Sequence, residues 1–306
     1  MKKWIKRILL ILIVSVFTIF WILEITHQVQ YLRVNRYFDD HEINAYDLVT
    51  TSYGEIAVRS YGDSQNDVLV FIHGFMGSSY DFRKLSSALE NDFYIVAIDL
   101  VGFGFSDKSA DFDYTKTNQA MMIHEVLTQL EINQYAIAGH SMGGEVSMRH
   151  ASLYPEHVTH LLLFASVGPR IQAESSTPPI VFYRFVFKNY LLQRLAFNST
   201  FYQDSFKNSD YYHPMFYINK DIPPQTIQAY SKASSDTSLQ EIIEQLTVPT
   251  LLIYGLQDTW TPAIIGEALD TMIENSTLVI LEDTGHLPMI EASNLMVDEI
   301  LQFLNP

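Results

Sequence analysis

Hydrophobic and polar residues follow two different patterns along this chain, and the change between them comes after Leu23. The segment from Ile8 to Leu23 is apolar on all sides, with Ser15 and Thr18 as its polar members. As a helix it would measure roughly 24 Å at about 1.5 Å per residue, a little short of a hydrocarbon core of about 30 Å. Further along, short apolar runs alternate with segments that have helical spacing.

This alternation predicts an α/β fold. Continuous apolar runs are typical of strands that are covered on both faces of a parallel sheet. Strands are predicted at Glu55–Ser60, Val68–Ile72, Tyr94–Leu100, Tyr135–Ala138, His160–Ala165, Thr250–Tyr254 and Thr277–Leu281. Helices are predicted at Tyr80–Leu89, Thr117–Leu130, Met142–Leu153, Thr261–Met272 and Ser293–Leu304. Repeated strand–helix units place helices on both faces of a mostly parallel sheet.

The alternation breaks between residues 170 and 247. This stretch is dense in aromatic residues, among them Phe182, Phe185 and Tyr212, and it lacks short buried strands. We interpret it as a helical cap inserted between two strands of the sheet. The predicted organisation is an N-terminal anchor at residues 1–27, an α/β core at 28–169 and 248–306, and the cap at 170–247.

The N-terminal apolar run has the features of an uncleaved signal anchor. Four basic residues precede it: Lys2, Lys3, Lys6 and Arg7. A cleaved signal peptide needs small residues at its cleavage site, and Phe20–Val29 has none in that arrangement. The basic flank predicts a single-pass protein with a cytoplasmic N-terminus and its catalytic part on the outer, extracellular or periplasmic, face. Residues 28–47 are polar and aromatic, and we expect a short connector there.

Composition narrows the possible chemistry and partners. The 306 residues include no cysteine, which excludes disulfides, thiol catalysis and zinc–thiolate sites. The net charge of −16 disfavours binding to phosphate backbones, so nucleic acid is not expected as a partner. A neutral substrate fits this charge better than a strongly anionic one.

The segment Gly139-His140-Ser141-Met142-Gly143 lies between a predicted strand and a predicted helix. This is the setting of a G-x-S-x-G nucleophile elbow, in which a sharp turn lifts the serine hydroxyl clear of the sheet. The following helix points its N-terminus at the serine, which favours negative charge that develops there. Ser141 is therefore the predicted nucleophile.

A serine hydroxyl needs a base, and the base needs an acid to orient it. His286 follows a predicted strand near the C-terminus, and Asp258 follows the strand before it. The order serine, acid, histidine is the one expected for a nucleophile elbow on an α/β sheet. Asp283 is the rival acid, for which loop capping is the simpler role. We expect a packing role for His140 and surface positions for His27, His41, His124, His150, His157, His160 and His213.

A tetrahedral intermediate needs backbone N–H donors. One is expected from Met142, which follows the nucleophile. The second is expected from Phe75, in the glycine-rich turn His73-Gly74-Phe75-Met76-Gly77 after the strand Val68–Ile72.

Together these motifs resemble the α/β-hydrolase superfamily over nearly all of residues 45–306. The matching segments are His73-Gly74, Asp99–Ser106, Gly139–Gly144, Asp258 and Gly285-His286, in that order. The Gly-His-Ser-Met-Gly-Gly form is similar to monoacylglycerol lipases and related carboxylesterases, and the insertion is similar to the cap of that family. Haloalkane- and epoxide-active members carry aspartate at the elbow, so Ser141 argues against those chemistries. The resemblance implies no metal and no cofactor, and a structural role for Asp99.

The leading functional hypothesis is hydrolysis of a small-molecule ester or lipid with an apolar acyl chain. Some cap aromatics, such as Phe182, Phe185 and Tyr212, would then line an acyl cleft. The same triad also serves carbon–carbon bond hydrolases and cofactor-free perhydrolases. A non-catalytic receptor on this fold is the alternative from another class.

Overall fold

The computed structural model describes residues 2–38, 42–109, 111–169, 189–233 and 238–305. Its centre is an eight-stranded sheet with the order β1-β2-β4-β3-β5-β6-β7-β8. β1 and β2 are antiparallel to their neighbours, and the strands from β4 to β8 run parallel. The strands are β1 Asp47–Thr51, β2 Gly54–Tyr61, β3 Val68–Ile72, β4 Tyr94–Ile98, β5 Tyr135–His140, β6 Val158–Phe164, β7 Thr250–Gly255 and β8 Ser276–Leu281. The predicted α/β-hydrolase fold is confirmed.

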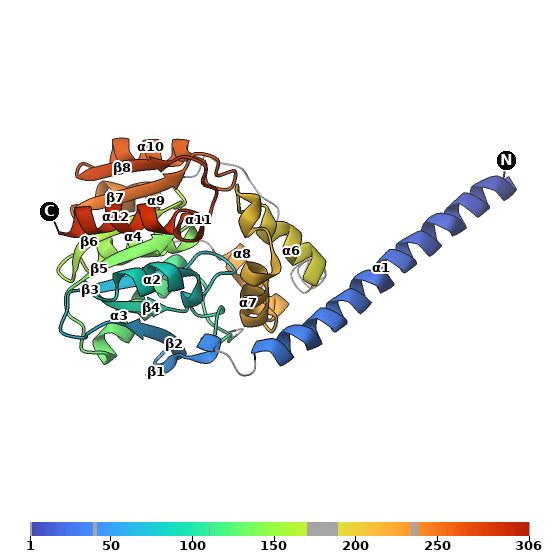
Figure 1. Ribbon diagram of the computed structural model, residues 1–306, viewed down its shortest axis with the longest axis horizontal. Helices are drawn as coiled ribbons and strands as arrows, with labels where there is room; N and C mark the ends of the chain where they lie inside the picture. The colour runs from blue at the N-terminus through green and yellow to red at the C-terminus, as the bar shows by residue number, and fades with distance from the viewer. Residues whose placement is uncertain (1, 39–41, 110, 170–188, 234–237, 306) are drawn as a thin grey trace.

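Helices cover both faces of this sheet (Figure 1). They are α2 Arg83–Leu89, α3 Lys116–Gln129, α4 Met142–Leu153, α10 Ala263–Met272, α11 Pro288–Glu291 and α12 Ser293–Leu304. Side chains alternate along β3, so that Val70 and Ile72 join one apolar cluster with α3, α4 and α10. Leu69 and Phe71 join a second cluster with α2, α11 and α12. Burial on both faces explains why the strands appear in the sequence as continuous apolar runs.

Four helices lie between β6 and β7 in the described part of the insertion: α6 Tyr190–Asn198, α7 Ser209–Asn219, α8 Pro224–Lys232 and α9 Leu239–Glu244. Three of them have side-chain N-caps: Asn189 accepts from Leu191 and Leu192, Asn208 from Asp210, and Ser238 from Glu241. α8 and α9 add side chains to the cluster around α3 and α4. α6 and α7 pack on each other and on the end of α1.

Helix α1 runs from Lys2 to Phe38, so the connector expected at residues 28–47 is helical over its first part. Its stretch Lys3–Asn35 is long and apolar enough to cross a membrane. The end of α1 is stabilised by packing, since Val34 is buried among side chains of α6 and α7 and Tyr31 donates to Asp221 at 3.1 Å. Helix formation propagates readily once started, which favours one continuous helix over a break at residue 28.

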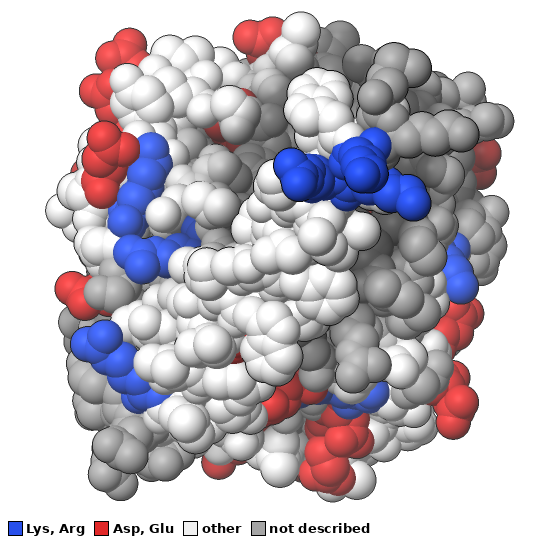
Figure 2. All heavy atoms as spheres, turned by 90° about the vertical axis from the view of Figure 1, so that its right-hand side faces the viewer, with Lys and Arg blue, Asp and Glu red and all other residues white. Residues whose placement is uncertain are grey.

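The free end of α1 stands away from the rest of the molecule (Figure 1). Figure 2 views the molecule from that side, and basic side chains gather around the protruding end, with uncharged atoms behind them. Lys3, Lys6 and Arg7 are the basic residues of this end whose side chains the structure describes. The basic residues at the N-terminal end of α1 therefore directly precede its long apolar stretch.

Candidate active site

Ser141 sits between β5 and α4 in a backbone conformation that few residues adopt, with φ of 52° and ψ of −119°. The turn is held by the Ser141 N–H, which donates to the Phe164 carbonyl at 3.0 Å. Gly143 is required here because a Cβ would lie 2.4 Å from the Ile72 carbonyl oxygen. The predicted elbow is therefore present, and its strain is concentrated at the serine.

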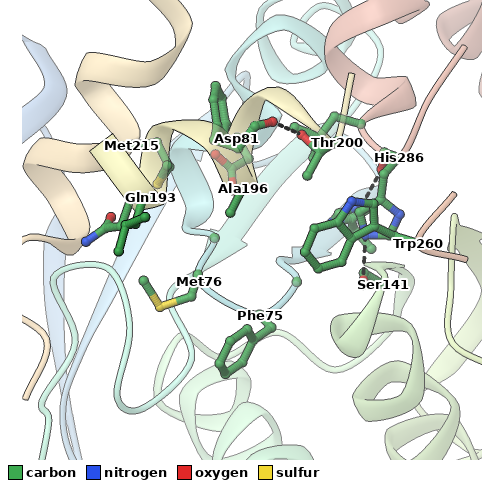
Figure 3. Close-up of a pocket in the computed structure, with 16 residues that line it drawn as sticks. Phe75, Met76, Asp81, Ser141, Gln193, Ala196, Thr200, Met215, Trp260 and His286 are labelled. Atoms are coloured by element: carbon green, nitrogen blue, oxygen red, sulfur yellow. Dashed lines mark hydrogen bonds between the residues drawn. The ribbon is translucent and has the colours of Figure 1, made fainter. Parts of the chain in front are cut away.

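His286 and Asp258 extend a chain of contacts from Ser141. The Ser141 Oγ lies 3.1 Å from His286 Nε2, and His286 Nδ1 lies 2.8 Å from Asp258 Oδ2. His286 and Asp258 are 6% and 4% exposed, so their interaction is shielded from water, while Ser141 is half-buried at the cavity. The structure brings together the three side chains that sequence analysis selected. Figure 3 shows two of them, Ser141 and His286.

Asp258 is prepared as an acceptor by the loop after β7. Its Oδ1 accepts the N–H groups of Trp260 at 2.7 Å and Thr261 at 3.0 Å. Burial pushes the pKa of Asp258 upward, but the hydrogen bonds from His286 and Thr261 outweigh burial and leave the pKa below its usual value. An ionised Asp258 favours the tautomer of His286 that carries its proton on Nδ1 and leaves Nε2 free to accept.

Thr261 is a part of this site that sequence reasoning missed. Its hydroxyl lies 2.8 Å from Asp258 Oδ2, 3.0 Å from His286 Nδ1 and 2.7 Å from the Ala165 carbonyl. The contact with Ala165 joins the ends of β6 and β7 beneath the histidine. Only the position of Thr261 three residues after Asp258 hints at this in the sequence.

The backbone of His286 is held from two sides. Its N–H donates to the Thr200 carbonyl at 2.7 Å, and its carbonyl accepts from His140 Nε2 at 2.7 Å. Burial, and then the neighbouring His286, lower the pKa of His140 to about 3, so His140 stays neutral as a donor. The predicted packing role of His140 thus includes one directed hydrogen bond.

Glu291 joins the histidine loop to the insertion. Its carboxylate accepts the N–H of Gly285 at 2.6 Å and the N–H of Gln203 at 2.8 Å. Together with the bond from His286 to Thr200, this fixes residues 200–203 against the loop that carries the histidine. Sequence reasoning did not single out Glu291.

The glycine-rich turn after β3 passes directly beside the serine. A Cβ at Gly74 would lie 3.1 Å from Ser141 Cβ and 2.8 Å from His140 Nδ1. The turn is closed by the Gly77 N–H, which donates to the Gly74 carbonyl at 3.1 Å. Phe75 belongs to this turn, and Met142 is the first residue of α4, so its N–H has no acceptor within the helix. Both predicted oxyanion donors therefore lie next to Ser141.

A cavity of about 280 Å³ opens beside Ser141 and His286 (Figure 3). Most of its wall is apolar and is formed by the β3 turn and by α6 and α7, with Phe75, Met76, Leu192, Ala196, Phe197 and Met215. The residues of α6 that line it recur with helical spacing. Trp260 covers the outer side of His286, with ring centroids 6.0 Å apart.

Among the described aromatic residues of the insertion, Phe197 lines the cavity and Tyr212 does not. Tyr212 is fully buried between α6 and α7, and its hydroxyl donates to the Tyr190 carbonyl at 2.8 Å. Phe182 and Phe185 lie outside the described residues. The apolar wall of the cavity comes instead from aliphatic, methionine and other phenylalanine side chains.

The remaining acidic and histidine predictions can be placed as well. The Asp283 side chain is exposed, and Asp99 is buried, where it accepts the N–H groups of Ser79 at 2.6 Å and Phe105 at 2.7 Å. The surface prediction for His150 is wrong, because its ring is buried and contacts the hydroxyl of Tyr135 at 2.6 Å. The others are half-buried: His27, His124, His157, His160 and His213. His41 lies outside the described residues.

Comparison with known proteins agrees with this architecture. The family model for the alpha/beta hydrolase fold matches residues 67–293. The chain belongs to the α/β-hydrolase family. It is 30% identical to the uncharacterized hydrolase YugF of Bacillus subtilis (strain 168), over 80% of this chain and 92% of that protein. It is 26% identical to Lipase 1 of Psychrobacter immobilis, over 89% of this chain and 87% of the lipase.

Among solved structures, the α/β hydrolase resembles a membrane phospholipase A described as a bacterial virulence factor. The TM-score is 0.73 and the identity 20%, with 100% of this chain and 98% of that chain covered. At this identity the likeness concerns the fold alone. The relatives in sequence are hydrolases by name, and this agrees with the prediction that the chain is a hydrolase.

Proposed function

We propose that this α/β hydrolase cleaves carboxylic esters with an apolar acyl chain, through an acyl-enzyme on Ser141. The observation that carries the proposal is the unbroken chain of contacts from Ser141 through His286 to Asp258, at the wall of an apolar cavity. A nucleophile, a base and an orienting acid in this geometry are the requirements of serine catalysis.

In the acylation step, Ser141 Oγ attacks the ester carbonyl carbon while His286 Nε2 takes the hydroxyl proton. Asp258 stabilises the positive charge that His286 then carries. The carbonyl oxygen becomes an oxyanion, for which the N–H groups of Phe75 and Met142 are the proposed donors, aided by the N-terminus of α4. His286 returns its proton to the departing alkoxide, and the alcohol leaves.

In the second step, His286 accepts a proton from water, which attacks the acyl carbonyl carbon of the intermediate. The second tetrahedral intermediate collapses, the proton returns to Ser141 Oγ, and the carboxylic acid is released. Ionised Asp258 keeps the imidazole in the same orientation through both steps, and the hydrogen bond from His140 to the His286 carbonyl limits movement of the loop.

The apolar wall supports an ester with an apolar chain as the substrate, rather than a polar or highly charged one. Pockets of this kind gain affinity from the apolar surface that they remove from water. Lipase 1 among the relatives is consistent with this choice. Carbon–carbon bond hydrolysis, perhydrolysis and a receptor role would use or retain the same three residues, but nothing in the cavity favours them.

The proposal includes the placement of the protein. The apolar length of α1 and its basic N-terminal end support an uncleaved signal anchor with a cytoplasmic N-terminus. The catalytic part would lie on the outer face, with the insertion at residues 170–247 as its cap. The end of α1 packs on α6 and α7, so the anchor and the cap would be in contact.

The direct test is ester hydrolysis by the detergent-solubilised full chain. We expect turnover of p-nitrophenyl butyrate and octanoate, and a loss of roughly 10⁴-fold or more in kcat for Ser141→Ala, because the nucleophile is removed. Circular dichroism of the variant serves as the control for folding. A folded Ser141→Ala variant that keeps more than a tenth of the wild-type rate would refute the assignment.

A further inference from the structure

One side chain in the cavity wall differs in kind from its neighbours. Among the described residues that line the cavity, Asp81 is the one carboxylate, and none is lysine or arginine. It belongs to the 3₁₀ turn η2, Ser79–Phe82, and reaches the cavity from the side of the β3 turn. Figure 3 shows it apart from Ser141 and His286, so it is not a member of the proposed triad.

Local structure explains part of the role of Asp81 but not its position. Its Oδ2 accepts the Ser78 N–H at 2.9 Å, as in a helix cap. A Cβ at Gly77 would lie 2.6 Å from the same oxygen, so the carboxylate presses against another residue of the cavity wall. An uncharged asparagine could accept the same hydrogen bond. Capping alone therefore does not require a negative charge in an apolar cavity.

We propose that Asp81 is a specificity-determining residue. It makes the enzyme prefer esters whose cavity-bound part, acyl or alcohol, is uncharged, and discriminate against esters with an anionic group in that part. This inference rests on the proposed ester hydrolysis and names its substrate class. Two like charges in a shielded cavity repel each other strongly, and the unfavourable contact discriminates between otherwise similar substrates. Two unit charges about 8 Å apart at an effective dielectric constant of about 20 would lower kcat/KM roughly 30-fold.

The charge on Asp81 depends on pH within a range where the enzyme can be assayed. Burial, with a smaller contribution from the nearby Asp99, raises the pKa of Asp81 to about 6. The Ser78 N–H and Arg83 act in the opposite direction and lower the pKa, but by less. Across the cavity, His140 and His286 are the other titratable side chains of the wall. Rejection of anions should therefore be strongest above pH 6 and weaken as Asp81 becomes protonated below it.

The test compares two esters of equal length that differ in charge alone. One ends in a sulfonate, which stays ionised from pH 5 to 8, and the other ends in a neutral methyl sulfone. One pair carries these groups on the acyl chain and a second pair on the alcohol, because either part of an ester could occupy the cavity. The readout is the ratio of kcat/KM, neutral over anionic, for the full chain in detergent.

We expect this ratio to be at least about tenfold lower in Asp81→Asn than in the wild type for one of the two pairs. Full loss of the repulsion would lower it by roughly 30-fold. The matched control is Asp298→Asn, which removes a carboxylate from the exposed side of α12 and should leave the ratio unchanged. In the wild type the ratio should fall as the pH drops from 8 to 5, and in Asp81→Asn it should be flat.

The outcomes separate the two proposals. If the wild type hydrolyses none of the esters, the proposed function itself is wrong. If it hydrolyses them but the ratio is the same in wild type and Asp81→Asn for both pairs, the inference about Asp81 is overturned. If Asp81→Asn does not fold, the pH dependence in the wild type decides, and a ratio that is constant from pH 8 to 5 overturns the inference.

Discussion

At the scale of single residues, the site depends on how His286 is held. Its ring is oriented by Asp258, while its backbone is fixed by His140 and by Thr200. A hydrogen bond to a charged group contributes roughly 1.5–3 kcal/mol, so the carboxylate is the strongest of these restraints. Asp258 and Asp283 are the two candidates for the acid that orients His286. In the structure, His286 Nδ1 contacts Asp258, whereas the Asp283 side chain is exposed.

We therefore expect Asp258→Asn to be far more harmful than Asp283→Asn. Asparagine keeps the shape of the side chain but favours the wrong tautomer of His286, which should lower kcat by roughly 10³- to 10⁴-fold. Asp283→Asn changes an exposed side chain and serves as the matched control, with activity within about twofold of the wild type, as is usual for surface changes. Equal impairment in steady-state assays of the two variants would show that the acid is misplaced.

At the scale of elements, α6 decides the shape of the cavity. Leu192, Ala196 and Phe197 face the cavity, whereas Leu195 on the same helix is 67% exposed. Each methylene of an acyl chain that enters such a wall gains about 0.8 kcal/mol, roughly fourfold in kcat/KM. Preference for chain length should therefore be set by how far the chain can extend along α6.

Filling the cavity at Ala196 should shorten the preferred acyl chain. We expect Ala196→Phe to lower the ratio of kcat/KM for p-nitrophenyl octanoate over butyrate by at least about tenfold, since several methylenes would be excluded at about 0.8 kcal/mol each. Leu195→Phe places the same ring on the exposed side of α6 and should leave the ratio near its wild-type value. An unchanged ratio in a folded Ala196→Phe variant would mean that the acyl chain binds elsewhere.

The elements that could be predicted from the sequence are those whose pattern is local. Val68–Ile72 and Met142–Leu153 have the predicted bounds, because an apolar run and a periodic segment after a sharp turn define them without help from distant residues. Ser141, Asp258 and His286 could be found because each follows a strand at the same edge of the sheet.

What could not be predicted depends on contacts between distant segments. The end of α1 is polar in sequence and becomes helical where it packs on α6 and α7. The short strand β1 lacks a marked apolar pattern, since it lies at the edge of the sheet and pairs with β2 alone. Thr261 and Glu291 act through loops that meet only in the folded chain. Aromatic density in the insertion did not show which rings reach the cavity: Phe197 lines it, whereas Tyr212 packs inside the insertion.

At the scale of the whole molecule, charge and apolar surface are distributed unevenly. The chain has a net charge of −16, while the first residues of α1 are basic. Helix α1 has a long apolar stretch, and none of its most apolar 18-residue window is buried in the protein. Exposed apolar surface of this extent is typical of segments that contact a membrane or a partner. A membrane would cover this surface, and the acidic remainder would stay clear of anionic lipid head groups.

We expect the full chain to stay with membranes through washing at high salt, because an apolar anchor is not released by screening of charge. In intact cells, added protease should cleave the catalytic part, while an epitope at the N-terminus should be protected. Recovery of a soluble form that lacks about the first 25 residues would instead show that the segment is a signal peptide and is cleaved.

In the proposed mechanism, Ser141 carries the acyl group during turnover. The most direct measurement is intact-protein mass spectrometry of the full chain after acid quenching in the presence of p-nitrophenyl octanoate, followed by peptide mapping. We expect a mass increase equal to one octanoyl group, located on the peptide that contains Ser141 and absent from Ser141→Ala. An octanoyl group on any other residue, or turnover by Ser141→Ala at the wild-type rate, would contradict this mechanism.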